Sequence, residues 1–410
     1  MTTISLCRLC QSSSLTSVID FGDIAFTGVF PQSANEKVPL GRLNVLFCEE
    51  CGLAQLGESF PADELYGDNY GYRSGLNKSM VTHLETTVRR LENIISLKFG
   101  DVVCDIGSND ATLLNSYQVS GLQKIGIDPT IKKYRDFYRS DTIPVADFFS
   151  SDNFFNNLDK KAKIVTSIAM FYDLENPVQF AREIHSILES DGIWHFEQSY
   201  TPWVLRTGAF DTICHEHLEY YTLKTIKNIL DLSGFDIVGV STNAINGGSI
   251  SVTASPRIGN PRALPVHADW LLQMEDAHGF NTVKAWEKFA KIVSSRKNDV
   301  LRLLTSLQEN NQTTLGLGAS TKGNVLLQVM GIDASLIPAI GEVNDYKWGR
   351  VTPGSNIPII SEQEVLERNP DNVLILPWHF RETFVKNLRP NVESGMKLIF
   401  PLPEVEVIGY

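Results

Sequence analysis

The fold is decided by residues 101–114, which read Asp101-Val102-Val103-Cys104-Asp105-Ile106-Gly107-Ser108-Asn109-Asp110-Ala111-Thr112-Leu113-Leu114. An apolar run breaks at a turn that contains one glycine and then continues as a helix-forming pattern. In α/β folds that bind nucleotides, such a turn lets the backbone approach a ligand at the carboxyl end of the first strand. A dinucleotide site would require Gly-x-Gly-x-x-Gly, and this stretch offers Gly107 alone. The turn therefore predicts a nucleoside ligand without a strong phosphate cradle.

Downstream of this turn, strand and helix patterns alternate. Strands are expected at 124–129, 163–174 and 192–198, and a helix at 175–190. Such alternation indicates a parallel sheet. S-adenosylmethionine carries an amino-acid tail and no phosphate, and Asp-x-Gly is typical of its sites. We therefore predict an α/β protein whose residues 66–255 form a Rossmann-like S-adenosylmethionine-dependent methyltransferase domain.

Candidate cofactor contacts follow the ends of these strands. Asp128 ends the second strand, where ribose hydroxyls are commonly bound, and Asp147 and Phe148 could meet the adenine amine and ring. The predicted cofactor-binding set is Asp105, Gly107, Ser108, Asn109, Asp128, Asp147, Phe148 and Met170. Each acid alone could equally be a solvated loop residue, and Met170 could equally be ordinary core.

Two Cys-x-x-Cys pairs lie near the N-terminus, Cys7 with Cys10 and Cys48 with Cys51. Two such turns supply the tetrahedral shell of four thiolates that structural zinc prefers. A redox dithiol would need only one pair. Because four protein ligands leave no open position, the predicted zinc is structural. It should pin a small lobe over residues 1–65.

A dense polar segment occupies 212–221, Thr212-Ile213-Cys214-His215-Glu216-His217-Leu218-Glu219-Tyr220-Tyr221. Methylation of a carbon first requires removal of its proton, and a histidine beside a glutamate suits that step. The unperturbed imidazole pKa of about 6.5 is near a working pH. A structural polar cluster is one alternative. A metal site is another, although His-x-His shares a face only on a strand and the metalloprotease spacing His-x-x-x-His is absent.

A second α/β unit begins at 313–324, where a strand, a tight glycine turn and a helix start follow one another. Free N–H groups at such a helix start attract phosphate, and Lys322 adds a positive charge. A plain strand-to-helix turn is the alternative. Residues 267–312 are rich in helix formers and predict a helical connector. Residues 256–410 are therefore expected to be a helical connector followed by a second α/β unit.

Composition limits the partners. The 410-residue chain has a formal net charge of −12, which argues against a nucleic-acid partner. The N-terminus lacks a signal-peptide pattern, and no apolar run approaches the ~20 residues that span a bilayer. We expect a cytoplasmic protein without a membrane partner, and a monomer.

These motifs together resemble the sugar C-methyltransferases, which methylate a carbon of a nucleotide-linked 4-keto-6-deoxyhexose. The resemblance is carried by the two cysteine pairs, Tyr70-Gly71-Tyr72-Arg73-Ser74, Asp105–Asp110, Phe196-Glu197-Gln198, His215-Glu216-His217, Asn246-Gly247-Gly248-Ser249, the 316–324 loop and Thr352-Pro353-Gly354. The resemblance implies three parts: a zinc lobe, a methyltransferase domain and, within 256–410, a C-terminal Rossmann-like domain that helps to hold the sugar nucleotide.

The resemblance implies that His217 is the base, with Glu216 beside it. Tyr70 or Tyr72 would line the site, and His215 would either line it or orient its neighbours. The chain departs from the family pattern at Cys214, where some relatives carry tyrosine, and at Ala111, where glycine is usual.

The expected substrate contacts lie mainly in the C-terminal third. They are Asn246, Ser320, Lys322, Asn324, Lys347, Arg350 and His379. Asn246 could instead simply shape an Asn-Gly hairpin. Lys347 could be a solvated loop residue and His379 a capping residue.

The expected function is C-methylation of a nucleotide-linked 4-keto-6-deoxyhexose, at C3, in branched-chain deoxysugar synthesis. One alternative is O- or N-methylation of a small molecule, which would keep the fold without needing a strong base. The other is a non-catalytic zinc-lobe protein that serves as a binding or scaffold module.

Overall fold

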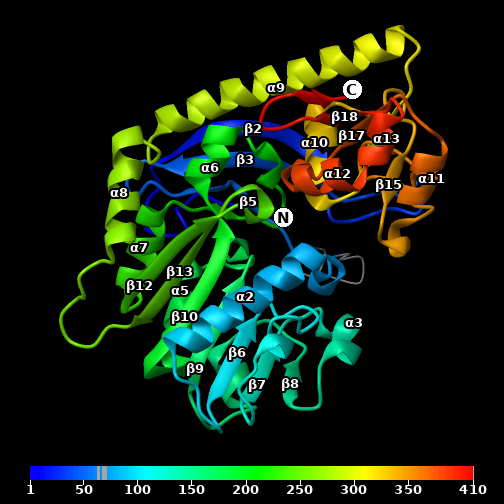
Figure 1. Cartoon of the computed structure of the whole chain (residues 1–410). Coiled ribbons are helices and arrows are strands. Elements are labelled where there is room, and N and C mark those ends of the chain that lie inside the picture. Colours follow the sequence, from blue (N-terminus) through cyan, green and yellow to red (C-terminus); the bar gives the residue numbers. More distant parts are fainter. Residues whose placement is uncertain (62–64, 67–71, 410) are drawn as a thin grey trace.

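The structure is a computed structural model that describes residues 1–410 except 62–64, 67–71 and 410 (Figure 1). Its central element is a seven-stranded sheet with the order β12-β13-β10-β9-β6-β7-β8. Strands β6 to β10 are mutually parallel, and β13 runs antiparallel to β10 and β12. The strands are β6 (Val102–Ile106), β7 (Gln123–Ile127), β8 (Thr142–Val145), β9 (Ala162–Ile168), β10 (Leu188–Ser199), β12 (Phe235–Asn243) and β13 (Ser249–Pro256). The predicted Rossmann-like sheet is confirmed.

Helices cover both faces of this sheet because its strands alternate their apolar side chains. Val103 of β6 packs with the face of α2, whereas Cys104 packs with α5 and α7 on the opposite face. The helices of this part are α2 (Lys78–Ile94), α3 (Ile131–Tyr134), α4 (Ser151–Phe155), α5 (Pro177–Ile187), α6 (Thr201–Thr207) and α7 (Leu223–Leu232). The strand order places a topological switch between β6 and β9, where ligands of such sheets bind.

The N-terminal lobe is a four-stranded antiparallel sheet with the order β11-β4-β3-β2. It contains β2 (Leu15–Ala25), β3 (Leu40–Cys48), β4 (Ala54–Leu56) and β11 (Glu219–Tyr220), beside a short pair of β1 (Thr2–Thr3) and β5 (Glu58–Ser59). Strand β11 comes from the polar segment 212–221. The lobe therefore incorporates two residues of that segment into its own sheet.

The C-terminal part is a second α/β unit, as predicted. Its six strands have the order β16-β15-β14-β17-β18-β19, all parallel except β19. They are β14 (Thr314–Leu317), β15 (Ile340–Glu342), β16 (Ile359–Ser361), β17 (Asn372–Ile375), β18 (Lys397–Phe400) and β19 (Glu406–Ile408), with α10 (Thr321–Met330), α11 (Glu362–Glu367), α12 (Arg381–Asn387) and α13 (Arg389–Glu393). A second switch point lies between β14 and β17.

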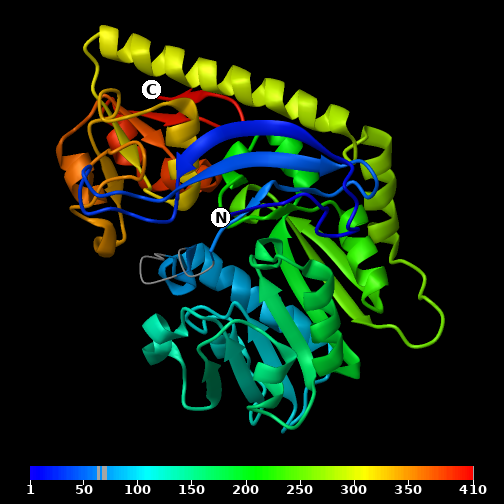
Figure 2. The ribbon, with the colours of Figure 1, turned by 180° about the vertical axis from the view of Figure 1, so that it is seen from behind.

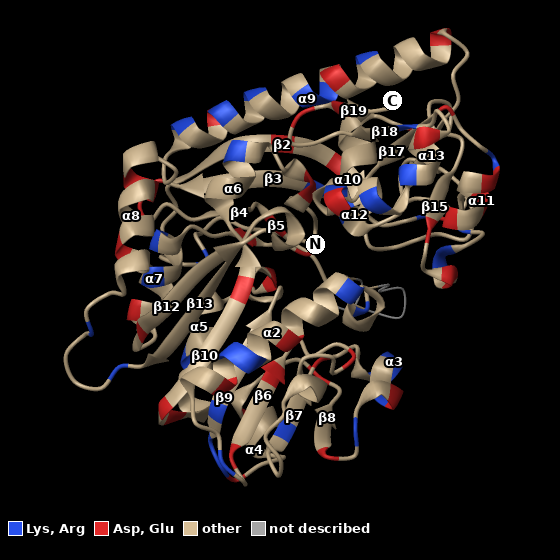
Figure 3. Cartoon of the chain, in the orientation of Figure 1, with Lys and Arg blue, Asp and Glu red and all other residues tan. Residues whose placement is uncertain are grey.

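The predicted connector is two helices, α8 (Val266–His278) and α9 (Val283–Glu309). Helix α9 crosses above β2 and β3 and reaches the C-terminal sheet (Figure 2). Trp286, Phe289 and Val293 fill the core beneath it, while lysines, arginines and acids share its outer side (Figure 3). None of the helices in the described part of the chain has the length and apolarity that a bilayer crossing demands.

The hydrophobic cores do not coincide with the three predicted segments 1–65, 66–255 and 256–410. Cys7, Leu9, Cys48 and Leu53 belong to the core of the methyltransferase sheet. The rest of the β2–β3 hairpin, including Leu43 and Val45, shares one core with the C-terminal sheet. The hairpin therefore joins two cores, and the three-domain division stays a prediction.

A buried carboxylate on α8 fastens the connector to the methyltransferase domain. Glu275 is fully buried; it accepts hydrogen bonds from the N–H of Leu223 at 2.6 Å, the hydroxyl of Tyr200 at 2.6 Å and the N–H of Lys224 at 3.1 Å. These contacts cap the start of α7.

Replacing Glu275 by alanine should lower the free energy of unfolding by about 2–4 kcal/mol, because three buried donors lose their acceptor. Urea unfolding followed by circular dichroism measures this change. Gln273→Ala, at an exposed position of the same helix, is the matched control and should lie within about 0.5 kcal/mol of the parent. Equal stability of the two variants would contradict the assignment.

Candidate active site

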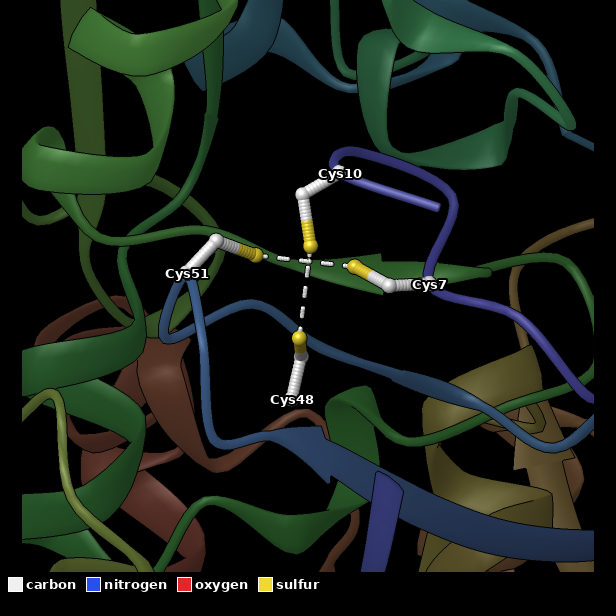
Figure 4. Close-up of side chains that lie close together, drawn as sticks. All are labelled: Cys7, Cys10, Cys48 and Cys51. Atoms are coloured by element: carbon white, nitrogen blue, oxygen red, sulfur yellow. Dashed lines mark hydrogen bonds between the residues drawn. The ribbon is translucent and has the colours of Figure 1, made fainter. Parts of the chain in front are cut away.

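The four predicted metal ligands converge on one point (Figure 4). Their sulfur atoms all lie within 4.8 Å of one another, with 3.5 Å between Cys7 and Cys51 and between Cys10 and Cys48. Zinc–sulfur bonds of about 2.3 Å place the sulfurs of a tetrahedron roughly 3.8 Å apart. Gly52, with φ of 80°, allows the second turn to bend as the knuckle requires. The set fits a structural zinc ion.

Arg8 links this cluster to the polar segment 212–221. It lies between Cys7 and Cys10 and is buried. Its guanidinium donates to the Leu56 carbonyl at 2.7 Å and lies 3.8 Å from the carboxylate of Glu219. Strand β4 in turn pairs with β11. The zinc turns and the segment that carries His217 are therefore held together by one guanidinium and one strand pair.

The candidate cofactor site is a cavity of about 210 Å³ at the carboxyl ends of β6, β7 and β9. Seven of the eight predicted cofactor residues line it, namely Asp105, Gly107, Ser108, Asn109, Asp128, Phe148 and Met170. Asp147 is not among the lining residues. Its carboxylate instead accepts hydrogen bonds from the N–H of Phe148 at 2.8 Å and from Asn153 at 3.2 Å. Asp147 therefore shapes the turn after β8, and the predicted contact with adenine is not supported.

Two carboxylates define the floor of this cavity. Burial raises the pKa of Asp105 to about 7, although the Thr166 hydroxyl donates to it at 2.6 Å. Asp128 accepts the N–H of Asn109 at 2.9 Å and thus fixes the loop after β6. A cationic ligand would favour the charged form of Asp105, and S-adenosylmethionine carries an ammonium and a sulfonium. The residues therefore fit this cofactor.

The loop after β6 also holds the segment that precedes α2. Asn109 accepts the N–H of Ser74 at 3.0 Å, and Asp110 accepts the N–H of Gly75 at 2.9 Å. These bonds place Tyr72 on the lining of the cavity. Ala111 keeps a φ of 60°, the conformation that glycine adopts freely, so the departure at this position leaves the turn intact. Tyr70 lies outside the described residues.

Several lining residues were not predicted as site residues. They are Tyr66, Phe149, Asp173, Glu197, Gln198 and Ser249. Glu197 and Gln198 end β10, and polar residues at the carboxyl end of an apolar strand were the signal that could have found them. Glu197 already contacts His83 and Asn243, each at 2.7 Å, and therefore ties α2 and β12 to the cavity wall.

His217 lies beside this cavity and not on its lining. Its Nδ1 donates to the carbonyl of Thr212 at 2.7 Å, so the neutral ring has its lone pair on Nε2. No described residue makes a hydrogen bond with Nε2. The ring packs on Tyr172 with centroids 4.1 Å apart, and the next residue, Asp173, lines the cavity. His217 is thus a neutral imidazole with an available nitrogen near the cofactor site.

The two neighbours of His217 have different surroundings. His215 is fully buried between Phe26 and Phe60, with ring centroids 4.6 and 4.9 Å away, and its Nε2 donates to the Gly41 carbonyl at 3.1 Å. This placement supports a packing role and not a catalytic one. Glu216 is buried, and burial raises its pKa. One of its oxygens lies 2.7 Å from where a Cβ on Gly28 would be, so Gly28 makes room for this carboxyl.

Of the predicted substrate contacts, three gather around Lys322, whose charge also acts on His217. Lys322 donates to the carbonyl of Asn246 at 2.7 Å, and Asn246 lines the cavity. The charge of Lys322 lowers the pKa values of both His217 and His379, after burial as the larger cause. His379 also lies beside the hairpin, 3.9 Å from where a Cβ on Gly247 would be. Helix α10 therefore brings the C-terminal sheet to the edge of the cofactor site.

The other four predicted substrate contacts instead make hydrogen bonds with backbone groups of the protein; they are Ser320, Asn324, Lys347 and Arg350. Ser320 caps α10 by accepting the N–H of Gly323 at 3.0 Å. Asn324 is fully buried and donates to the Thr27 carbonyl at 2.7 Å. Lys347 is buried against the Ala319 carbonyl at 2.6 Å, so the solvated alternative is wrong.

Arg350 belongs to the same group of structural contacts. Its guanidinium donates to the Phe30 carbonyl at 2.9 Å. Spacing in the sequence could not distinguish such internal contacts from contacts with a substrate.

The acid limit of activity should lie far below that of an ordinary histidine. Enclosure, and then the charge of Lys322, lower the pKa of His217 to about 3, so the imidazole stays neutral and able to accept a proton at pH 5. Lys322→Met should raise this pKa and move the acid limb of kcat/KM to higher pH. The pH profile of kcat/KM measures it, with Lys288→Met, at an exposed position, as control. An unmoved limb in Lys322→Met would contradict the coupling.

Three family models match successive parts of the chain. They are described as "Putative zinc binding domain" for residues 7–66, "Methyltransferase domain" for 80–240 and "C-methyltransferase C-terminal domain" for 244–403. The C-methyltransferase NovU of Streptomyces niveus is 27% identical over 410 residues, covering 99% of this chain and 97% of NovU.

Solved methyltransferases resemble part of the chain. A chain from the complex of the Trm112 methyltransferase activator and a methyltransferase of Haloferax volcanii is 15% identical, covers 45% of this chain and 95% of its own, and has a TM-score of 0.37. An S-adenosylmethionine-dependent methyltransferase of Clostridium acetobutylicum is 10% identical, covers 43% and 92%, and has a TM-score of 0.35.

The family models and the full-length relative agree with the zinc ligands, the cofactor cavity and the second α/β unit described above. The non-catalytic scaffold considered from the sequence is therefore set aside. The protein is therefore an S-adenosylmethionine-dependent C-methyltransferase, an enzyme that transfers a methyl group to carbon.

Proposed function

We propose that the protein methylates C3 of a nucleotide-linked 4-keto-6-deoxyhexose. The observation that carries this proposal is the neutral His217 ring, whose Nδ1 is bound to the Thr212 carbonyl and whose Nε2 is available beside the cofactor cavity. A base in this state suits the removal of a proton from carbon, which methylation of a hydroxyl or an amine does not require.

In the proposed reaction Nε2 of His217 takes the proton from the carbon beside the ketone, and the electrons of the C–H bond move to the ketone oxygen. S-adenosylmethionine, when bound, supplies an electrophilic methyl group. The enolate carbon would take this methyl group, the electrons of the sulfur–methyl bond would stay on the departing thioether, S-adenosylhomocysteine, and the ketone would re-form. The imidazolium of His217 would then pass its proton to solvent. Most of the remaining rate advantage would come from holding the two reactants in line.

The C-terminal sheet would hold the nucleotide part of the substrate. Its switch point between β14 and β17 ends in the glycine turn and the start of α10, where free N–H groups attract phosphate. Lys322 adds a positive charge and already contacts Asn246 of the cavity at 2.7 Å. A diphosphate at this helix start would leave the sugar directed toward His217.

A panel of dTDP-, CDP- and GDP-linked 4-keto-6-deoxyhexoses, incubated with the protein and methyl-labelled cofactor, tests the proposal. We expect a product heavier by one methylene unit, with carbon NMR placing the label on a quaternary ring carbon. A label on oxygen or nitrogen would contradict carbon as the acceptor. A label on C5, the other carbon beside the ketone, would contradict only the position.

A further inference from the structure

Gln198 is a cavity-lining side chain whose two polar atoms both lack a hydrogen-bond partner among the described residues. It lies at the carboxyl end of β10 and is only 1% exposed. It lines the cavity, yet neither its amide oxygen nor its amide nitrogen has a partner among the described residues. Buried polar groups in native proteins are nearly always hydrogen-bonded. Because exchanging the two amide atoms leaves both without a described partner, both remain available to a bound molecule.

The position of Gln198 in the sheet indicates which bound molecule its amide would contact. Strand β10 lies two strands from β6 and three from β7 in the sheet order. With neighbouring strands about 4.8 Å apart, its end is roughly 10 Å from the turn at Gly107 and roughly 14 Å from Asp128. Asn246 and Ser249, which line the cavity at the same end, come from the hairpin that Lys322 contacts. Gln198 therefore lies on the acceptor side of the cavity.

The chemistry of the Gln198 amide indicates which groups of the bound molecule it would contact. It is neutral and offers a donor and an acceptor side by side. The carboxylate of Glu197, its neighbour in the chain, is already bonded to His83 and Asn243 and is a poor partner for an oxygen that gains negative charge. A keto-sugar offers the complementary groups: its ketone oxygen accepts a hydrogen bond, and a ring hydroxyl donates one.

We propose that Gln198 is a substrate-binding residue whose amide N–H donates to the ketone oxygen of the acceptor and whose amide oxygen accepts from a ring hydroxyl. This inference rests on the proposed function. Because negative charge builds on the ketone oxygen as His217 removes the proton, the N–H bond strengthens during the reaction. Gln198 would then help to decide which carbon loses its proton.

Gln198→Met tests the proposal, since methionine nearly keeps the volume and removes both polar atoms. We expect kcat to fall about 100-fold and the exchange of substrate hydrogen for solvent deuterium to fall in parallel. The Kd of S-adenosylmethionine should change less than twofold. The Tm of the free protein should be unchanged or higher, because a buried amide without a partner is removed. Gln179→Met, at an exposed position on α5, is the matched control and should match the parent in all four measurements.

Three outcomes would overturn the inference. One is an unchanged kcat and deuterium exchange in Gln198→Met. Another is a cofactor Kd weakened more than tenfold with the acceptor KM unchanged, which would assign the amide to the cofactor. The third is a Tm well below the parent, which would show that the amide has a protein partner.

Failure of the proposed function itself would look different. In that case the parent protein, and not only the variant, would exchange no hydrogen and transfer no methyl group with any of the keto-sugars.

Discussion

His217→Asn is expected to abolish methyl transfer and to leave cofactor binding intact. Asparagine can still donate to the Thr212 carbonyl, which Nδ1 contacts at 2.7 Å, but it cannot accept a proton from carbon at neutral pH. Loss of a general base costs about 10²–10⁴-fold in rate, and we expect the upper end because a C–H proton beside a ketone is a weak acid.

Three measurements separate the effects of this variant. Single-turnover kinetics with labelled cofactor measures the chemical step, calorimetry measures the Kd of S-adenosylmethionine, and NMR measures solvent deuterium at the acceptor carbon. Exchange should disappear together with methyl transfer. His267→Asn, an exposed histidine of α8, is the control. If His217→Asn kept more than a tenth of the parent kcat, another group would be the base.

Loss of the zinc site is expected to have the second-largest effect. Binding of zinc to a four-thiolate site contributes about 10–16 kcal/mol of apparent free energy, which becomes folding free energy of the lobe that it pins. Because β4 pairs with β11 and Arg8 approaches Glu219, a disordered lobe would also release the segment that holds His217. Methyl transfer should then be lost. Binding of S-adenosylmethionine should persist, because the cofactor cavity is built mainly from β6, β7 and β9.

Cys10→Ser together with Cys48→Ser tests this expectation. Metal analysis should find far less than one zinc per chain, and proteolysis should cleave the first 60 or so residues rapidly. Cys104→Ala, a cysteine of β6 outside the cluster, is the control and should keep its zinc. A doubly substituted protein that transferred methyl groups at the parent rate would show that the lobe does not position the base.

Much of the fold could be predicted because short local patterns in the sequence indicate it. The single glycine at Gly107, the apolar runs that follow and the two cysteine pairs each define a unit in a few consecutive residues. The strand order at the β12 edge of the methyltransferase sheet was harder to predict. The antiparallel strand β13 depends on a hairpin at 244–248, which packs against residues of the C-terminal part. The sharing of cores by the β2–β3 hairpin is a tertiary property, and no periodicity within residues 15–48 reveals it.

Predicted residues line the cavity where backbone geometry determines their position, whereas several predicted substrate contacts have hydrogen-bond partners inside the protein. Gly107, Asn109 and Asp128 line the cavity because the turn after β6 requires it. Asn324, Lys347 and Arg350 have the chemistry of substrate contacts but satisfy carbonyls of residues near 27–30 and 319. Those partners are brought close only by folding, so a sequence pattern could not separate the two roles.

The β2–β3 hairpin has a practical consequence for anyone who wishes to change which sugar is accepted by exchanging parts between relatives. A chimera cut near residue 256 would leave the donor's C-terminal sheet facing a hairpin that it never evolved to pack against. Leu43 and Val45 share the core of that sheet, and the carbonyl of Thr27 is bonded to Asn324 at 2.7 Å. A transplant that carries residues 15–48 along with the C-terminal third would preserve these contacts, and only such a two-piece graft should yield soluble hybrids.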